Sequence, residues 1–306
     1  MGTILTGTAS WTDPTLLATD WYPETATTPE ERLRFYASRF PLVEVDSTFY
    51  SLPAERTAIL WAERTPDEFT FDFKGFRLFT GHPTPLKALP KHVRNDLPAE
   101  LQEKTQIYNK DLPGPVADEL WDMYRRALMP VHSAGKLGAV FMQFPKWFYF
   151  SRDNLDQLAH LRERFPDYPL AVEFRQASWM SEEHARRTLD CLRDAGIAYT
   201  CVDEPQGTKA SVPPVAAATA DLSVVRFHGR KRDTWDRPGV GVEERFRYLY
   251  DEGELAEWVP KVQQLAEEAR EVHILMNNCY ADYGVRNARQ LSLLLEQAGA
   301  DVGQSS

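Results

Sequence analysis

Four short stretches of the sequence place ionisable residues between apolar neighbours at alternating positions. They are LVEVD (42–46), FTFDFKG (69–75), AVEFR (171–175) and VVRFHG (224–229). Such alternation is typical of a strand that buries one face. If the apolar residues pack against helices, the charged residues share the opposite face. Carboxylates and cations gathered there could carry out acid–base chemistry, hold a divalent ion or bind an anion.

The alternation assigns each side chain to a face. Val43 and Val45 take the apolar side, so Glu44 and Asp46 face inward. The same reasoning predicts these further inward residues: Asp72, Lys74, Gln143, Glu173, Arg175, Asp203, Arg226, His228 and Asn277. A buried, unpaired carboxylate costs several kcal/mol or shifts its pKa until it is neutral. The five acids must therefore pair with cations or bind a ligand. One interpretation is an ion-pair network that only holds the fold together, and the other is a functional site.

The elements that position these residues alternate between short apolar runs and helical stretches. The runs are 4–10, 42–46, 69–75, 137–144, 169–174, 198–203, 222–229 and 271–278. Apolar residues at three- and four-residue spacing predict helices over 29–40, 55–64, 117–133, 152–165, 181–195, 254–269 and 284–298. This order predicts an α/β fold, a (β/α)8 TIM barrel forming a single domain over 1–306. A doubly wound open sheet is the alternative, but no G-x-G-x-x-G motif or P-loop follows the first run.

Two long connections fall on the barrel face where the strands end. Residues 76–115 contain His82 and several prolines, and we expect a lid-like insertion there. Residues 230–253 contain all but the first residue of the run GRKRDTWDRPG (229–239). Catalytic loops of such barrels gather at the C-terminal face, so both connections are expected beside the site. The last residues, 299–306, are expected to form a flexible tail.

The composition narrows the class of protein. The chain has 306 residues, of which 43% are hydrophobic, and contains no run of 18 apolar residues, so we expect no membrane span. Its first residues, MGTILTGTASW, lack a basic region and a long apolar region, so we expect no export signal; its three cysteines lack paired spacing, and we expect a cytoplasmic location. A net charge of -10 argues against a broad DNA-binding face. We expect a monomer.

Several motifs together resemble the YecE-like family, a group of unknown function with a TIM-barrel fold. They are GTASW (7–11), WYP (21–23), VEVDSTFYSLP (43–53), FTFDFKG (69–75), LGAVFMQFP (137–145), AVEFRQASW (171–179), RFHGR (226–230) and MNNCYADYGVRNA (276–288). The resemblance places the family's motif positions on Trp11, Glu44, Ser47, Phe49, Tyr50, Lys74, His82, Gln143, Pro145, Glu173, Arg175, Trp179, Arg226, His228, Gly229, Asn277 and Asn278. Asp46 stands where the family commonly carries Asn, and Asp72 where it commonly carries a small or hydroxyl residue. The resemblance implies a fold and a site but no reaction.

Three chemistries remain open. A metal-assisted phosphodiesterase or nuclease would hold one Mg or Mn ion with ligands from Glu44, Asp46, Glu173, Asp203 and His228. A glycosidase would use Glu44 and Glu173 as its paired carboxylates. Anion capture would use Lys74, Arg175, Arg226, the GRKR run at 229–232, and the helix start after Asn277 and Asn278.

We predict that the polar pocket binds a small anionic, phosphate-bearing ligand and that the protein is an enzyme, with hydrolase as the candidate class. Glu44, Glu173 and His228 are the candidate catalytic residues. The candidate ligand-binding residues are Trp11, Phe49, Tyr50, Lys74, His82, Gln143, Arg175, Trp179, Arg226, Asn277 and Asn278. The alternative is a non-catalytic protein that binds a ligand or single-stranded nucleic-acid ends through the same cations and aromatic rings.

Overall fold

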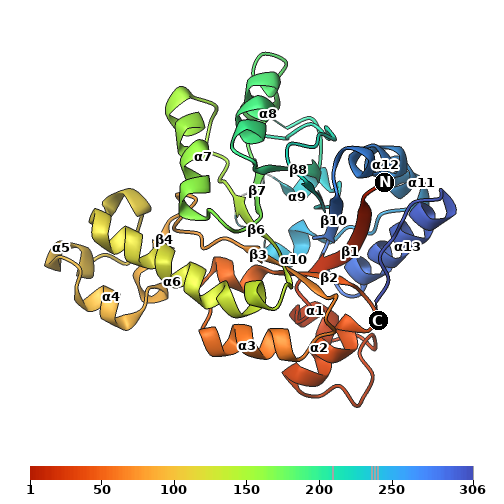
Figure 1. Cartoon of the computed structure of the whole chain (residues 1–306), viewed down its shortest axis with the longest axis horizontal. Coiled ribbons are helices and arrows are strands. Elements are labelled where there is room, and N and C mark those ends of the chain that lie inside the picture. Colours follow the sequence, from red (N-terminus) through yellow and green to blue (C-terminus); the bar gives the residue numbers. More distant parts are fainter. Residues whose placement is uncertain (209, 236, 238, 240, 306) are drawn as a thin grey trace.

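Eight parallel strands close into a barrel, as the sequence predicts (Figure 1). The computed structural model describes residues 1–208, 210–235, 237, 239 and 241–305. The strands follow one another around the barrel in the order β1-β10-β9-β8-β7-β6-β3-β2. They are β1 (Thr3–Ala9), β2 (Leu42–Val45), β3 (Thr70–Lys74), β6 (Leu137–Gln143), β7 (Leu170–Glu173), β8 (Ala198–Asp203), β9 (Leu222–Phe227) and β10 (Glu271–Met276). The fold is a (β/α)8 TIM barrel.

Helices cover the outside of the barrel. The long ones are α2 (Pro29–Ala37), α3 (Glu55–Glu63), α6 (Gly114–Ser133), α7 (Arg152–Arg164), α8 (Ala185–Asp194), α12 (Val259–Glu268) and α13 (Tyr283–Gln297). Capping side chains set some helix starts: Thr28 forms a capping box with Glu31 before α2, and the Ser151 hydroxyl accepts from the Asn154 amide before α7. The single helix expected over 254–269 is divided into α11 (Glu252–Ala256) and α12. No described residue between 204 and 221 is helical.

Short elements follow several strands at the C-terminal face. They are α1 (Pro14–Leu17) after β1, the 3₁₀ turn η1 (Asp46–Phe49) after β2, the 3₁₀ turn η4 (Ala177–Met180) after β7, and α9 (Arg232–Trp235) and α10 (Val242–Arg245) after β9. The strand ends, the loops after them and these short elements, and not the barrel helices, carry most of the residues discussed below.

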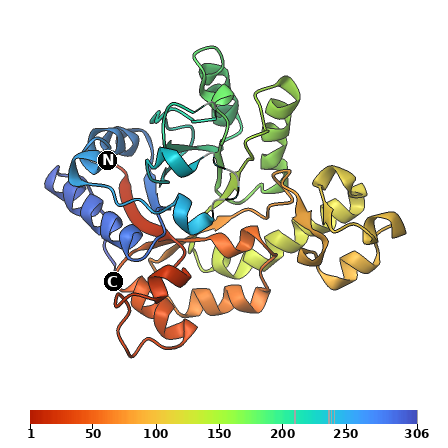
Figure 2. The same ribbon diagram turned by 180° about the vertical axis from the view of Figure 1, so that it is seen from behind.

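The insertion at 76–115 contains β4 (Thr84–Pro85), η2 (Leu86–Ala88), α4 (Lys91–Asn95), α5 (Ala99–Gln102), β5 (Gln106–Ile107) and η3 (Asn109–Asp111). Strands β4 and β5 pair with each other and not with the barrel. In both ribbon views the part with α4 and α5 forms a lobe at one end of the molecule, beside α6 (Figures 1 and 2). Only the first residues of the insertion lie near the ends of the barrel strands.

The faces assigned by alternation agree with the packing on most strands. Phe71 and Phe73 point outward onto Trp61 of α3. Inside the barrel, seven strands each contribute one residue to a separate apolar cluster: Leu5, Leu42, Phe141, Ala171, Ala198, Val224 and Leu275. A layer of charged side chains lies directly on this cluster, since the Arg226 guanidinium sits 4.7 Å from the centre of the Phe141 ring.

The C-terminal residues are held against the first strand. The Ile4 amide donates to the Asp301 carbonyl at 2.9 Å, and the Gly303 amide donates to the Ile4 carbonyl at 2.8 Å. Part of the segment expected to be a flexible tail, residues 301–303, therefore pairs with the start of β1. None of the helices in the described part of the chain is both long and apolar enough to cross a membrane.

Candidate functional site

Arg226 lies at the centre of the charged layer and joins two buried carboxylates. Its Nε and Nη2 donate to Glu44 at 3.0 and 2.8 Å, and its Nη1 donates to Glu173. All three side chains are fully buried. Such a forked pairing is the geometry that a planar guanidinium favours. Because the guanidinium lies between the two carboxylates, they do not form the open pair that a glycosidase needs on either side of a sugar bond.

Glu173 accepts hydrogen bonds from four side chains. Besides Arg226, its donors are Gln143 Nε2 at 2.6 Å, His228 Nε2 at 3.1 Å and Arg175 Nη1 at 3.2 Å. Burial favours the protonated form, but Arg226 and His228 outweigh it and hold the pKa of Glu173 well below its usual value. Glu173 does not line the cavity above it. Its geometry is that of a fixed carboxylate with its acceptor positions occupied, and not of a general base that takes up a proton from a substrate.

His228 is held between two neighbours beneath the site. Its Nε2 faces Glu173, and its Nδ1 lies 2.8 Å from the side-chain nitrogen of Asn277. An Asn277 amide that donates to Nδ1 leaves the proton on Nε2, which is the neutral tautomer. Burial lowers the pKa of His228 to about 3. Both ring nitrogens are therefore engaged, and the predicted proton shuttle or metal ligand does not reach the cavity.

A cavity of about 380 Å³ opens above this network where the strands end. Its polar lining includes Ser10, Asp13, Glu44, Asp46, Lys74, Gln143, Lys146, Arg175, Arg245 and Asn277, and its aromatic lining includes Phe49, Tyr50, His82, Trp147 and Phe246. Burial raises the pKa of Glu44 to about 6, against the opposing effect of Arg226 and Lys74. A larger groove of about 620 Å³ lies outside the barrel between α2 and α13, away from the buried charges.

Lys74 and Arg175 are two cations that line this cavity next to the buried carboxylates. The Lys74 ammonium lies 4.7 Å above the Phe49 ring and forms no ion pair or hydrogen bond with a described residue. Burial, followed by Arg226, lowers its pKa. Arg175 uses Nη1 for Glu173 and lies 3.6 Å from Glu204, while its guanidinium stacks 4.5 Å above Trp235. Its other nitrogens have no hydrogen-bond partner in the described part of the chain.

His82 is the part of the insertion that reaches the site. Its ring packs edge-on against Phe49 at 5.1 Å and Trp147 at 5.8 Å, and its Nδ1 lies 2.9 Å from the Thr80 hydroxyl. Burial, with Lys74 and Arg77 nearby, lowers its pKa to about 4. His82 is therefore a neutral wall of the cavity near pH 7.

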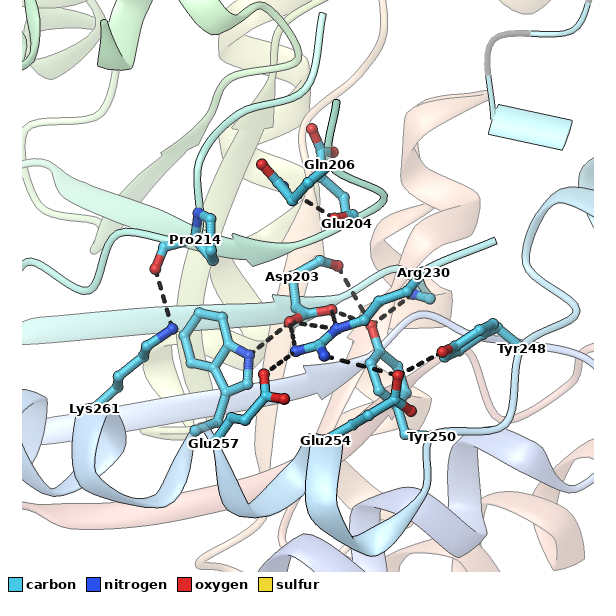
Figure 3. Close-up of polar contacts among 12 residues, drawn as sticks. Asp203, Glu204, Gln206, Pro214, Arg230, Tyr248, Tyr250, Glu254, Glu257 and Lys261 are labelled. Carbon is cyan, nitrogen blue, oxygen red and sulfur yellow. Dashed lines mark hydrogen bonds and ion pairs between the residues drawn. The ribbon is translucent and has the colours of Figure 1, made fainter. Parts of the chain in front are cut away.

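Asp203 does not face the barrel interior, and this prediction is wrong. Its carboxylate receives hydrogen bonds from Arg230, from the Tyr250 hydroxyl at 2.7 Å and from Trp258 Nε1 at 2.7 Å, on the side of α11 and α12 (Figure 3). Arg230 belongs to the GRKR run and also pairs there with Glu257 at 2.8 Å, so it does not face the site either.

The acid that β8 presents to the network is Glu204, which the sequence reasoning missed. Glu204 is buried, and burial raises its pKa to about 7 although Arg175 opposes this. Its Oε1 accepts from the Val212 amide at 2.8 Å, and its buried Oε2 has no hydrogen-bond partner among the described residues. Position 204 follows the alternation of Thr200 and Val202, which align with the inward residues of β9.

Asp72 lies below the site and forms a separate pair. Its carboxylate contacts His273 Nδ1 at 2.9 and 3.0 Å, and His273 Nε2 lies 3.3 Å from Glu271. Burial opposes the charge on His273, but Asp72 and Glu271 raise its pKa to about 10. The counter-ion of Asp72 is thus a histidine from the start of β10 and not one of the three cations expected.

Three predicted ligand-binding residues serve the packing instead. Trp179 is fully buried, stacks on Phe174 and donates to the Phe148 carbonyl at 2.6 Å. Asn278 donates to the Tyr248 carbonyl and to Asn287 on the helix side of β10. Trp11 packs edge-on against Trp61 and does not line the cavity, although its buried Nε1 lacks a partner.

The structure also brings in cavity residues that no motif indicated: Asp13, Lys146, Trp147, Arg245 and Phe246. Four of them come from loops whose sequence has no periodic pattern, and Arg245 ends the short helix α10. The run KWFYF at 146–150 follows Pro145, and a cluster of aromatic residues after a strand is the only signal that could have indicated it.

The predicted metal ligands do not converge. Asp203 lies on the other side of β8, His228 is engaged on both nitrogens, and Glu173 is surrounded by donors. Within the described ranges, no group of three or more His, Cys, Asp or Glu side chains is arranged to hold a metal ion. Cys279 lines the cavity, but burial raises the pKa of its thiol, which donates to the Ala9 carbonyl at 2.9 Å.

Comparisons with known proteins place this site in a family context. The family described as "Protein of unknown function DUF72" matches residues 5–306. YunF of Bacillus subtilis (strain 168) is 31% identical over 278 residues, which cover 90% of this chain and 89% of YunF. YecE of Escherichia coli (strain K12) is 24% identical over 251 residues, covering 76% of this chain and 77% of YecE.

Solved structures agree. A DUF72 family protein from Thermotoga maritima MSB8 superposes with a TM-score of 0.74 at 30% identity, covering 96% of this chain and 99% of that one. Another from Enterococcus faecalis V583 gives a TM-score of 0.76 at 25% identity, covering 96% of both chains. With the matching motifs and the shared barrel, these similarities show that the chain belongs to the DUF72 family, the YecE-like proteins of unknown function.

Proposed function

We propose that this protein is an enzyme that binds a small phosphate-bearing anion in the cavity above Arg226. The observation that carries the proposal is Lys74. Its ammonium faces a cavity and has no ion pair or hydrogen bond with a described residue. A cation desolvated in this way is costly unless an opposite charge joins it. A bound anion would supply that charge.

Arg175 provides the second anion contact. One of its nitrogens is committed to Glu173, and stacking on Trp235 fixes the plane of the guanidinium. The remaining nitrogens are available to a phosphate oxygen. A planar, oriented guanidinium beside a flexible ammonium is a common way for proteins to bind phosphate. Arg226 does not contact the anion directly, because its guanidinium already donates to Glu44 and Glu173. It holds these two carboxylates in place.

Glu44 is the candidate for proton transfer. It lines the cavity, and its pKa of about 6 is close to the range in which a carboxyl exchanges protons near neutral pH. Glu173, with a pKa well below its usual value, stays ionised and keeps the network charged. The two acids of the site therefore have different electrostatic environments and would serve different roles.

Titration calorimetry on the full chain tests the anion site, with inorganic phosphate and phenyl phosphate as probes. We expect binding of both, and Lys74→Met should weaken each by at least tenfold. Lys91→Met, on the exposed start of α4, should change neither affinity. Failure of both probes to bind, or equal affinities for the wild type and Lys74→Met, would contradict the proposal.

Hydrolysis of 4-nitrophenyl phosphate and bis(4-nitrophenyl) phosphate tests catalysis. Glu44→Gln should lower the rate about 100-fold or more, the range expected for loss of a general acid or base. The same variant should still bind inorganic phosphate. Turnover that is unaffected by Glu44→Gln would show that Glu44 has no catalytic role.

A second candidate function is non-catalytic binding of single-stranded nucleic-acid ends. It rests on Tyr50 and Trp147, which line the cavity and are 54% and 56% exposed, so that bases could stack on them. Binding of an oligonucleotide that weakens steeply with salt and is lost in Trp147→Ala would favour it over the enzyme.

A further inference from the structure

We propose that the ligand of this cavity is dipolar, with an anionic group on Lys74 and a protonated amine on Asp46. The inference rests on the proposed function, which supplies the anion contact, and it adds the class of substrate. Its basis is a second unpaired charge in the same cavity.

Asp46 is an acid without a counter-ion. It begins η1 directly after β2, lines the cavity and is partly buried. It forms no ion pair with a described residue, although Lys74 is its strongest favourable charged neighbour. Burial raises the pKa of Asp46 against that attraction. The Asp46 carboxylate and the Lys74 ammonium therefore face one cavity from adjacent strands without direct contact.

Other polar groups extend this separation of charge across the cavity. Asp13 follows β1, and its Oδ1 accepts from the Thr15 amide and hydroxyl, which fixes the carboxylate. Its Oδ2 has no hydrogen bond to a described residue. Lys74 ends β3 and Arg175 follows β7. Around the barrel the strands follow in the order β1, β2, β3, β6, β7, so these acids come from β1 and β2 and these cations from the strands after them.

The backbone of the acidic side is strained. Ser10 lines the cavity with φ at 68°, in the left-handed region that a serine rarely adopts. Its amide donates to the Glu44 carbonyl at 2.9 Å, which ties the loop after β1 to β2. Strain of this kind persists where the surrounding structure imposes it, commonly at ligand sites. Here it directs the loop that carries Asp13 toward the cavity.

A ligand with both charges fits this arrangement better than a simple anion. An anion alone would neutralise Lys74 and leave Asp46 unpaired in a low-dielectric site, where it would repel the ligand. An ammonium group placed at Asp46 removes that repulsion. The cavity of about 380 Å³ has room for such a compound together with an apolar portion against Phe49 and Trp147.

Two probes of matched size test the inference: O-phosphoethanolamine and ethyl phosphate differ by one ammonium group. Calorimetry on the full chain should show at least tenfold tighter binding of O-phosphoethanolamine. Asp46→Asn should remove this preference and leave ethyl phosphate bound as tightly as in the wild type, or more tightly. Asp153→Asn, an exposed acid on α7, is the matched control and should preserve the preference. Lys74→Met should weaken both ligands.

The outcomes separate the inference from the function on which it rests. Equal affinities of the wild type for the two probes would overturn the dipolar ligand and leave the anion site intact. A preference that survives in Asp46→Asn and in Asp46→Ser would overturn the assignment of the amine to Asp46. If neither probe binds, the proposed function fails together with the inference.

Discussion

Replacement of Arg226 by methionine should strongly destabilise the fold, because it leaves two buried carboxylates without their shared cation. Glu173 would keep Gln143, His228 and Arg175, whereas Glu44 would lose both of its hydrogen bonds. Breaking a buried ion pair from one side costs about 3–5 kcal/mol. For a chain of 306 residues, whose unfolding entropy is about 2.1 cal/mol/K per residue, that corresponds to a fall in Tm of roughly 5–8 °C.

The loss should depend on pH, and its sign follows from Glu44. Burial already raises the pKa of this group to about 6 in the folded protein, and removing Arg226 raises it further. A carboxyl whose folded pKa exceeds its unfolded value favours the folded state at low pH, and this contribution is lost as the pH rises. Each pKa unit is worth about 1.4 kcal/mol, so Arg226→Met should be less destabilised at pH 5 than at pH 8 by a few kcal/mol.

Equilibrium urea unfolding, followed by tryptophan fluorescence at both pH values, measures these changes. Adding Glu44→Gln to Arg226→Met should restore part of the stability at pH 8, since it removes the uncompensated charge. Arg186→Met is the control: its side chain is 95% exposed, and we expect a change within about 0.5 kcal/mol. A loss below about 1 kcal/mol in Arg226→Met, or the same loss at pH 5 and pH 8, would refute the reasoning.

Three further predictions concern the rest of the barrel. In NMR titrations His273 should stay protonated until about pH 10, and His228 should stay neutral down to about pH 3. The stability that His273 contributes is therefore lost as the pH rises from 6.5 toward 10. The stability that His228 contributes is lost as the pH falls from 6.5 toward 3. A titration of either ring near the ordinary histidine value of 6.5 would contradict its assigned contacts. Asp203→Ala should lower the free energy of unfolding in urea by about 3 kcal/mol or more, because it leaves buried donors unpaired. A decrease under about 1 kcal/mol would show that the cluster in Figure 3 contributes little to stability. Gly7→Ala should destabilise the fold by about 2 kcal/mol or more in thermal unfolding, because the new Cβ would lie 1.9 Å from a backbone oxygen of β2. In the control Gly114→Ala, in α6, the new Cβ meets no atom, so the change should be neutral or stabilising.

The barrel and the inward charges on four strands could be predicted because one charged residue on each strand stands between two large apolar residues. On β2, β3, β7 and β9 these residues are Glu44, Asp72, Glu173 and Arg226. When a strand packs between the lumen and the helices, such a pattern fits only one orientation of its two faces. The faces of these strands therefore follow from sequence alone.

Strand β8 shows where this reasoning fails. In AYTCVD, apolar residues occupy adjacent positions, so the pattern fits either face. An aspartate at the end was assumed to face inward, but Tyr250 and Trp258 provide polar hydrogen atoms on the helix side that satisfy it. These donors lie about 50 residues away in the chain, and local alternation contains no information about them. Glu204, one residue beyond the strand, takes the inward position instead.

The difference between Glu44, which we propose for proton transfer, and Glu173, which is held by four donors, was also beyond the sequence. Glu44 and Glu173 look equivalent in their strands, yet the four donors around Glu173 come from β6, β9 and the ends of β7 and β9. Only their convergence shows that Glu173 is saturated. The same convergence leaves Glu44 facing the cavity with a pKa of about 6.

Burying the charged layer costs desolvation free energy, although a barrel needs only apolar side chains to fill its interior. Just below it, one apolar residue from each of seven strands fills the lumen in the usual way. Replacing buried ion pairs by apolar residues is often neutral or stabilising, so stability alone does not explain why Glu44, Glu173 and Arg226 stand above that layer. Their mutual bonds do explain how Glu44 can be held rigidly at the floor of a cavity beside Lys74, whose charge they leave unpaired. Preorganised charges of this kind are what a binding site for an ionic ligand requires. The network therefore acts as the support, and the charges that it leaves unmatched, Lys74 and Asp46, are where the ligand is expected.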